Sequence, residues 1–284
     1  MPRLMIKDVV KIVEDGSIQP TVIIFHTLNI LALALVSVVL TIAMTARKIR
    51  RLRTWYIYVW TQLLLTIAFL LHPFKSSNYK PAYVPCLIQA MLVYATPPAS
   101  SWAFLALVVE VYVLMQANSS ILGTRFQFML LCTPINIFVC WATLVIIEGL
   151  KHPSSVGMQS DLSYCHLSIT TPAIIGAVIY LIPIVICIPL FASILLKAYR
   201  NSRVLLGERG HTVFIIPPTS ILRIGVLLFA PILGFGFAYP SGELEELNRF
   251  LPLVPILTAV AFGSHTDMVS VVKSLWARLS NVTT

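Results

Sequence analysis

The sequence predicts an all-α membrane protein, built as a seven-transmembrane helix bundle with a short interfacial C-terminal helix. Hydrophobic residues make up 58% of the 284 residues and charged residues only 11%, whereas a soluble domain carries about 25% charged residues. The apolar residues gather in stretches of about 18 residues or more, the length at which a helix can cross a bilayer. They do not alternate with a period of two, which favours helices over a β-barrel.

Seven such stretches follow one another, and most of them are joined by short loops. The predicted spans are Thr21–Ala46, Thr54–Phe74, Pro85–Gln116, Phe126–Ile147, Thr171–Leu196, Phe214–Tyr239 and Arg249–Val271. Because the number of crossings is odd, the two termini are expected on opposite sides of the membrane.

The basic residues predict which side faces the cytoplasm. Most of them lie on one side of the predicted bundle, in three turns and the C-terminal tail: Arg47, Lys48, Arg50, Arg51, Arg53, Arg125, Lys197, Arg200, Arg203, Arg209, Lys273 and Arg278. Turns rich in Lys and Arg face the cytoplasm. We therefore expect a multi-pass protein of the plasma membrane with an extracellular tail over residues 1–20, the bundle over residues 21–271 and a cytoplasmic tail over residues 272–284.

The C-terminal tail carries its own helical pattern. Apolar residues recur at helical spacing over Ser270–Leu279, with Trp276 among them and the basic residues Lys273 and Arg278 between them. A Trp together with snorkelling cations is typical of a helix that lies in the membrane interface. The alternative is that the seventh span continues for two more turns.

Two cysteines share the predicted extracellular side. Cys86 opens the third span and Cys165 lies in the loop before the fifth, while the other three cysteines fall inside spans. Disulfides persist on the oxidising face of a membrane. We expect a Cys86–Cys165 bridge that holds this loop over the bundle, with two unpaired thiols as the alternative.

Three ionisable residues lie inside the predicted spans, namely Glu110, Arg223 and Asp267. A lone charge at the centre of a bilayer costs about 2.5–3.5 kcal/mol on insertion scales. We therefore expect Arg223 to pair with Glu110, Asp267 or both, either as a latch between cytoplasmic helix ends or as a static ion pair.

Together, the seven spans and the two extracellular cysteines resemble the pattern of G-protein-coupled receptors. The triplet Glu110-Val111-Tyr112 stands where rhodopsin-like receptors place Asp/Glu-Arg-Tyr, with Val in place of the Arg, and Phe229-Ala230-Pro231 resembles the proline-bearing sixth helix. The Asn-Pro-x-x-Tyr motif of the seventh helix is absent. The stretches around Cys86, Ala95–Ser100 and Phe262-Gly263 are most similar to fungal receptor-type heptahelical proteins.

This resemblance implies a receptor for an extracellular or membrane-borne small ligand or peptide that signals through a heterotrimeric G protein. It implies a ligand pocket in the extracellular half, for which the candidates are Gln89, Tyr94, Tyr180, Phe235, Tyr239 and Phe250. It also implies a cytoplasmic coupling face, for which the candidates are Tyr112, Arg125, Arg200, Arg203 and Arg209.

Other function classes fit the sequence less well. A secondary transporter that uses Glu110, Arg223 and Asp267 as a charge relay is the main alternative. A retinal protein needs a Lys in the seventh span, which has none, and the scattered histidines disfavour a zinc hydrolase. We therefore expect no enzyme activity, no cofactor and no metal, with membrane lipids and the G protein as partners and no nucleic acid.

Overall fold

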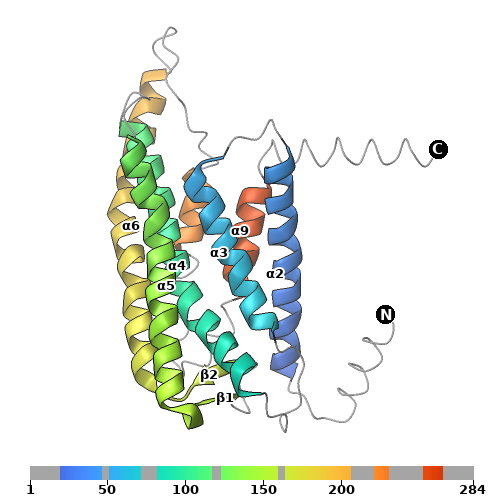
Figure 1. Cartoon of the computed structure of the whole chain (residues 1–284). Coiled ribbons are helices and arrows are strands. Elements are labelled where there is room, and N and C mark those ends of the chain that lie inside the picture. The colour runs from blue at the N-terminus through green and yellow to red at the C-terminus, as the bar shows by residue number, and fades with distance from the viewer. Residues whose placement is uncertain are drawn as a thin grey trace, which may run out of the picture.

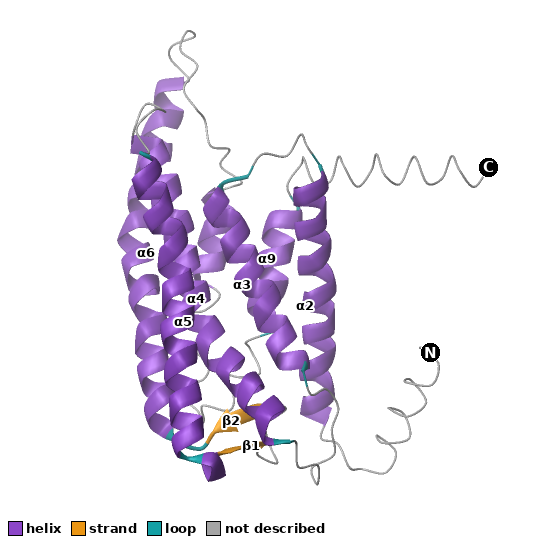
Figure 2. Cartoon of the chain, viewed as in Figure 1, coloured by secondary structure: helices purple, strands orange, loops and turns teal. Residues whose placement is uncertain are grey.

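The computed structural model describes residues 20–46, 51–71, 82–116, 123–158, 164–205, 221–229 and 252–264. Most of these residues are helical, as Figure 2 shows. The elements are α2 (Pro20–Thr45), α3 (Arg53–Leu70), α4 (Tyr83–Gln116), α5 (Thr124–Lys151), a 3-10 turn (Pro153–Ser155), β1 (Val156–Met158), β2 (Cys165–Leu167), α6 (Thr170–Leu205) and α9 (Leu253–Gly263). Residues 221–229 form a further helical segment.

The helices begin and end close to the predicted bounds of the first five spans. Four of them, over Val22–Thr45, Tyr83–Gln116, Thr124–Lys151 and Thr170–Arg200, are long and apolar enough to cross a membrane. This confirms the helical class and fits a multi-pass membrane protein.

The remaining spans are described only in part. The helix α3 is 18 residues long and lies beside α2 and α4, but Arg53 and several polar residues lower its hydropathy. The sixth predicted span is described over 221–229 and the seventh over 252–264, so the count of seven stays a prediction. The N-terminal tail and the predicted interfacial helix lie outside the described residues.

The bundle has two different ends (Figure 1). At one end β1 and β2 lie beside the starts of α4 and α6 and the end of α5, and we call it the hairpin end. At the other end α3 and α5 begin and α4 ends. We call it the basic end, because the described cations there are Arg51, Arg53, Arg125, Lys197 and Arg200.

The helix α4 lies at the centre of the bundle. It packs against α3, α5 and α6, and also against both strands. Small residues make this possible, because they let neighbouring backbones approach closely. The small residues of α4 that are buried include Ala90, Ala95, Ala99, Ala103 and Ala106.

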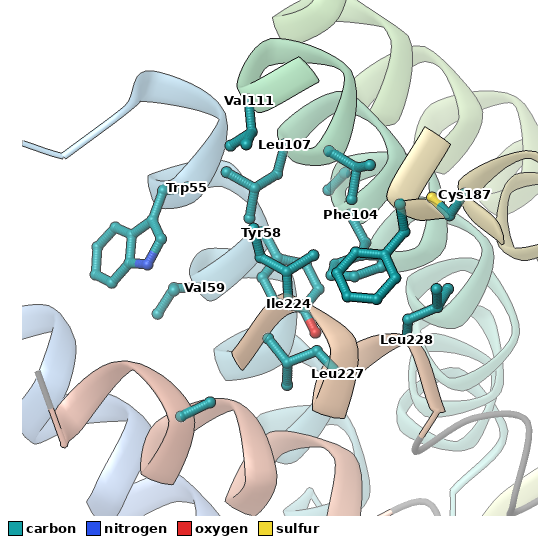
Figure 3. Packing of buried hydrophobic residues seen from close by; sticks show 14 of the residues in the cluster. Trp55, Tyr58, Val59, Phe104, Leu107, Val111, Cys187, Ile224, Leu227 and Leu228 are labelled. Carbon is teal, nitrogen blue, oxygen red and sulfur yellow. The ribbon is translucent and has the colours of Figure 1, made fainter. Parts of the chain in front are cut away.

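The largest apolar cluster joins α3, α4, α6, α9 and the 221–229 segment (Figure 3). Within it the ring of Tyr58 lies 5.4 Å from the ring of Phe104, and Trp55 lies edge-on to Phe262 with the ring centroids 5.5 Å apart. Tyr58 also exchanges a hydrogen bond of 3.1 Å with Thr258 of α9. These contacts connect α9, which is distant in sequence, to α3.

Large apolar side chains also cover the outside of α5 and α6. Phe128, Met129 and Val139 of α5, and Ile174 and Val185 of α6, are all more than half exposed. Continuous apolar surface of this kind requires apolar surroundings. Lipid contact along these two helices satisfies that requirement.

A close approach at Gly225 generates the first prediction. A Cβ atom at Gly225 would lie 2.8 Å from Cζ of Phe191, a buried residue of α6. Overpacking of this kind costs about 1–3 kcal/mol. We therefore expect Gly225→Val to lower the thermal unfolding midpoint of the purified protein in lipid nanodiscs.

The matched control is Gly157→Val. A Cβ atom at Gly157 meets nothing within 4 Å, and this residue lies in a strand, where Val is favoured. Equal midpoints for the two variants would show that residues 221–229 do not pack against α6 in this way.

Candidate functional site

The two cysteines on the predicted extracellular side form a disulfide. Cys86 of α4 and Cys165 of β2 are bonded, with Cα atoms 5.3 Å apart and a sequence separation of 79. The strand β2 pairs with β1 in antiparallel register, Met158 opposite Cys165. The predicted bridge is therefore confirmed, and it fastens the hairpin to the start of the central helix.

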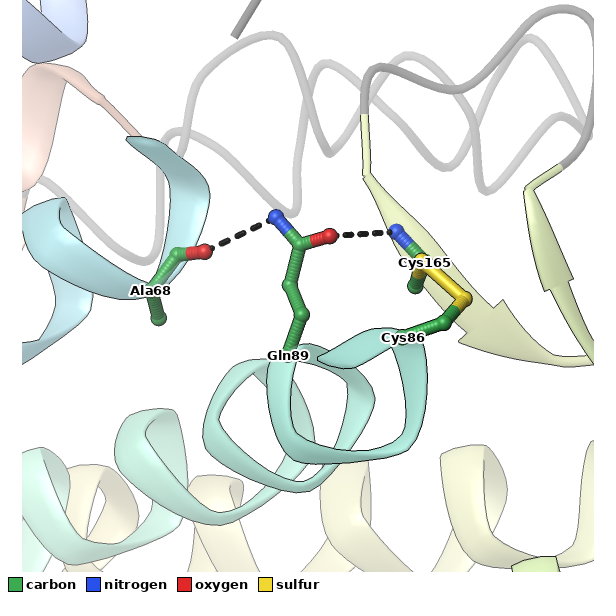
Figure 4. The surroundings of a disulfide bond; sticks show 4 residues. All are labelled: Ala68, Cys86, Gln89 and Cys165. Atoms are coloured by element: carbon green, nitrogen blue, oxygen red, sulfur yellow. Dashed lines mark hydrogen bonds between the residues drawn. A yellow bond between two sulfur atoms is a disulfide. The ribbon is translucent and has the colours of Figure 1, made fainter. Parts of the chain in front are cut away.

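A buried glutamine adds a second connection at the same place (Figure 4). The side chain of Gln89 is 0% exposed. Its amide nitrogen donates to the carbonyl oxygen of Ala68 at 3.0 Å, and its amide oxygen accepts from the backbone N–H of Cys165 at 3.0 Å. Gln89 thus joins the end of α3, the start of α4 and the strand β2.

Aromatic side chains close the space between the hairpin and the helices. The ring of Tyr164 lies 5.2 Å from that of Phe69 and 6.2 Å from that of Phe25. Tyr164, which directly precedes β2, is 5% exposed. The residue before the disulfide therefore packs between α2 and α3.

A histidine of the hairpin lies in the same region. His166 of β2 pairs with Gly157 of β1. Burial lowers the pKa of His166, and a hydrogen bond to the backbone of Gly157 offsets part of this effect. The neutral imidazole is therefore favoured at this site.

The ligand-pocket candidates have structural partners where they are described. Gln89 uses both ends of its amide, and the Tyr94 hydroxyl donates to the carbonyl of Leu167 at 3.3 Å. Tyr180 is half-buried against the main apolar cluster. Phe235, Tyr239 and Phe250 lie outside the described residues, so the pocket stays a prediction.

The charged residues of the predicted cluster have separate partners in the described part of the chain. The carboxylate of Glu110, which is 5% exposed, accepts a short hydrogen bond from the hydroxyl of Thr54. The guanidinium of Arg223 donates to the carbonyl oxygen of Ser264 at 3.0 Å. Asp267 lies outside the described residues, so its predicted pairing with Arg223 remains open.

The position of Thr54 explains how a carboxylate is accommodated there. Thr54 is the second residue of α3, so Glu110 lies at the N-terminus of that helix. Backbone N–H groups and the helix dipole favour negative charge at this end.

The candidates for a coupling face lie at the basic end or outside the described residues. Arg125 and Arg200 are exposed, whereas Tyr112 packs against the main cluster. Arg203 belongs to α6, and Arg209 lies outside the described residues. Lys197 donates to Gln116 at 2.9 Å and so connects α6 to the end of α4.

One feature was missed at the sequence level. Thr54, Tyr58, Gln62 and Thr66 are all buried and follow one another every four residues along α3. We call these four residues the polar column. Their spacing is visible in the sequence and places them on one helix face, so a search for polar residues at this period would have found them.

Metal ligands do not gather in the part of the chain that the structure describes. There, no group of three or more His, Cys, Asp and Glu side chains could hold a metal ion.

Comparisons with known proteins add no family assignment. No protein-family model matches the chain, and no curated protein is significantly similar to it.

The Gln89 connection generates a prediction. Gln89→Leu leaves the buried N–H of Cys165 and the carbonyl of Ala68 without partners, at a cost of about 1–3 kcal/mol for each group. We expect a lower unfolding midpoint and faster reduction of the disulfide by dithiothreitol. Gln127→Leu, on α5 far from the hairpin, is the control; the same change there would contradict the role of Gln89.

The Thr54–Glu110 hydrogen bond generates another prediction. Thr54→Val keeps the size of the side chain but removes the hydroxyl, and the loss of a bond to a charged group costs about 1.5–3 kcal/mol. We expect Thr54→Val to lower the unfolding midpoint and Thr54→Ser to retain most of it. Equal losses in the two variants would show that the methyl group, not the hydroxyl, matters.

Proposed function

We propose that the chain is a seven-transmembrane receptor of the G-protein-coupled type, which binds an extracellular or membrane-borne small ligand and signals through a heterotrimeric G protein. The observation that carries this proposal is the hairpin between α5 and α6, which a disulfide fastens to the start of the central helix. In this arrangement a loop is held over one end of a helical bundle.

Two independent arguments support one orientation. Apart from Lys151, the described cations that are exposed lie at the basic end, namely Arg53, Arg125 and Arg200, which favours the cytoplasm for that end. The disulfide lies at the hairpin end, which favours the oxidising side of the membrane for it. Both arguments support the proposal that the hairpin end, where α2 begins, faces outside, as in a plasma-membrane receptor.

In this orientation the hairpin end lies on the ligand side and the basic end lies on the G-protein side. The hairpin end is rigid, because the disulfide, Gln89 and Tyr164 all hold it. At the basic end, Lys197 donates to Gln116 and so connects α6 to the end of α4. A ligand bound in the extracellular half would shift an existing equilibrium between closed and open arrangements of the cytoplasmic helix ends.

A secondary transporter is the second candidate, and one observation favours it. The polar column connects the middle of the bundle to the buried carboxylate of Glu110. Intramembrane carboxylates of this kind serve proton relays in transporters.

Nucleotide exchange separates the two candidates. The purified chain in nanodiscs is screened with a compound library for ligand-dependent GTP exchange on G-protein alpha subunits. A receptor is expected to raise exchange with some compound, and the exposed-cation variant Arg125→Glu with Arg200→Glu is expected to weaken that response. The control is Lys151→Glu, an exposed cation at the hairpin end.

Two results would contradict the receptor proposal. Substrate-coupled proton flux in vesicles without any exchange would replace the receptor by the transporter. Tags at both termini that are accessible on the same face of intact cells would remove the odd-span topology on which the receptor depends.

A further inference from the structure

The four residues of the polar column lie at four equally spaced depths along α3, and we call these depths levels. Successive members are four residues apart, so they differ in depth by about 6 Å. At the first two levels a side chain of the column bonds to a side chain of another helix, Thr54 to Glu110 and Tyr58 to Thr258. At the next two levels, those of Gln62 and Thr66, buried oxygens lack partners among the described residues.

At the Gln62 level the interior polar groups are only half satisfied. The amide nitrogen of Gln62 donates to the hydroxyl of Ser100 at 2.5 Å. Its amide oxygen has no hydrogen-bond partner among the described residues, although Gln62 is 1% exposed. An amide oxygen can only accept, so it needs a donor from elsewhere.

At the Thr66 level two more oxygens lack partners. Thr96 is one turn from Ser100 on the same face of α4, and the hydroxyl of Thr96 has no partner within the described ranges. Phe25 of α2 and Phe69 of α3 lie at a similar depth, because their rings are 5.2 Å apart. Asn29 lies about one turn from Phe25, and Thr66 about one turn from Phe69, both towards the basic end. Asn29 therefore lies at a depth similar to that of Thr66. Its amide oxygen is also without a partner, and both residues are 0% exposed.

A proline pair frees backbone acceptors at this depth. Pro97 and Pro98 lie inside α4, directly after Thr96. Proline has no N–H, so the carbonyl oxygens of Val93 and Tyr94 lack their usual donors four residues later. Three side-chain oxygens and two carbonyl oxygens therefore lie within about two helical turns in depth of one another.

We propose that Asn29, Gln62, Thr96 and the carbonyls freed by the proline pair form an internal water-binding site in the middle of the bundle. Buried water is typically held by about three hydrogen bonds to otherwise unsatisfied groups. An apolar ligand leaves these acceptors unpaired, whereas water donates two hydrogen bonds and fits an acceptor-rich site.

The site lies between two differently held halves of α4. The half towards the hairpin carries the disulfide and Gln89, and the half towards the basic end carries Glu110 and Gln116. Water that bonds the freed carbonyls can exchange partners as these halves shift. The site therefore gives α4 a hydrated hinge.

Radiolytic hydroxyl-radical labelling tests this proposal on the full chain in nanodiscs. X-ray pulses generate radicals from bound water, and mass spectrometry locates the oxidised side chains. Leu65 lies next to the site and Leu107 lies in the apolar cluster, and each is 3% exposed. We expect Leu65 to be oxidised several-fold faster than Leu107.

Three variants test whether Thr96, Gln62 and the Val93 carbonyl hold the water. Thr96→Val and Gln62→Leu are each expected to lower the oxidation of Leu65 and to leave Leu107 unchanged. Pro97→Ala restores a donor to the Val93 carbonyl and is expected to lower the oxidation of Val93. The control Thr61→Val, whose hydroxyl bonds within its own helix at 2.7 Å, is expected to change neither.

The proposal fails on either of two results. Equal oxidation of Leu65 and Leu107 in the unaltered chain would show a dry interior. Fast oxidation of Leu65 that survives both Thr96→Val and Gln62→Leu would place the water elsewhere. The near-isosteric Thr96→Val keeps the test valid if Gln62→Leu does not fold.

Discussion

The close packing around α4 is the constraint on which the rest of the structure depends. Its alanines let α3, α5 and α6 approach its backbone closely. Every polar group that α4 and its neighbours do bury must then be satisfied inside the bundle, because hydrocarbon offers no partner. This requirement explains why the buried polar groups of Gln89, Glu110 and Thr96 need hydrogen-bond partners inside the bundle.

The buried polar groups divide into those that fix the fold and those with bonding capacity left over. Gln89 uses its whole amide to hold the hairpin, and Thr54 donates to Glu110 at the positive end of a helix. Gln62 and Asn29, in the middle of the bundle, keep amide oxygens that have no partner among the described residues. The polar groups that fix the fold therefore lie towards the two ends of the bundle, and the acceptor oxygens left over lie between them.

The charge distribution and the disulfide support the same orientation of the bundle in the membrane, and they do so for unrelated physical reasons. Cations collect where the cytoplasmic leaflet and the insertion machinery favour them, whereas a disulfide persists only where the compartment is oxidising. The structure separates the two features by the full length of the helices (Figure 1). This separation is the strongest support for a receptor-like orientation in the proposed function.

The sequence by itself determined the helices and the two cysteines that pair, because span length and apolar content are local properties and only Cys86 and Cys165 shared a predicted face. Tertiary structure decided the partners of the buried polar groups. The cost of lone charges inside the predicted spans suggested that Arg223 pairs with Glu110, Asp267 or both, yet the described fold gives Glu110 the hydroxyl of Thr54, which lies 56 residues away in sequence. Such partners depend on how two helices face each other, and neither helix encodes that rotation alone.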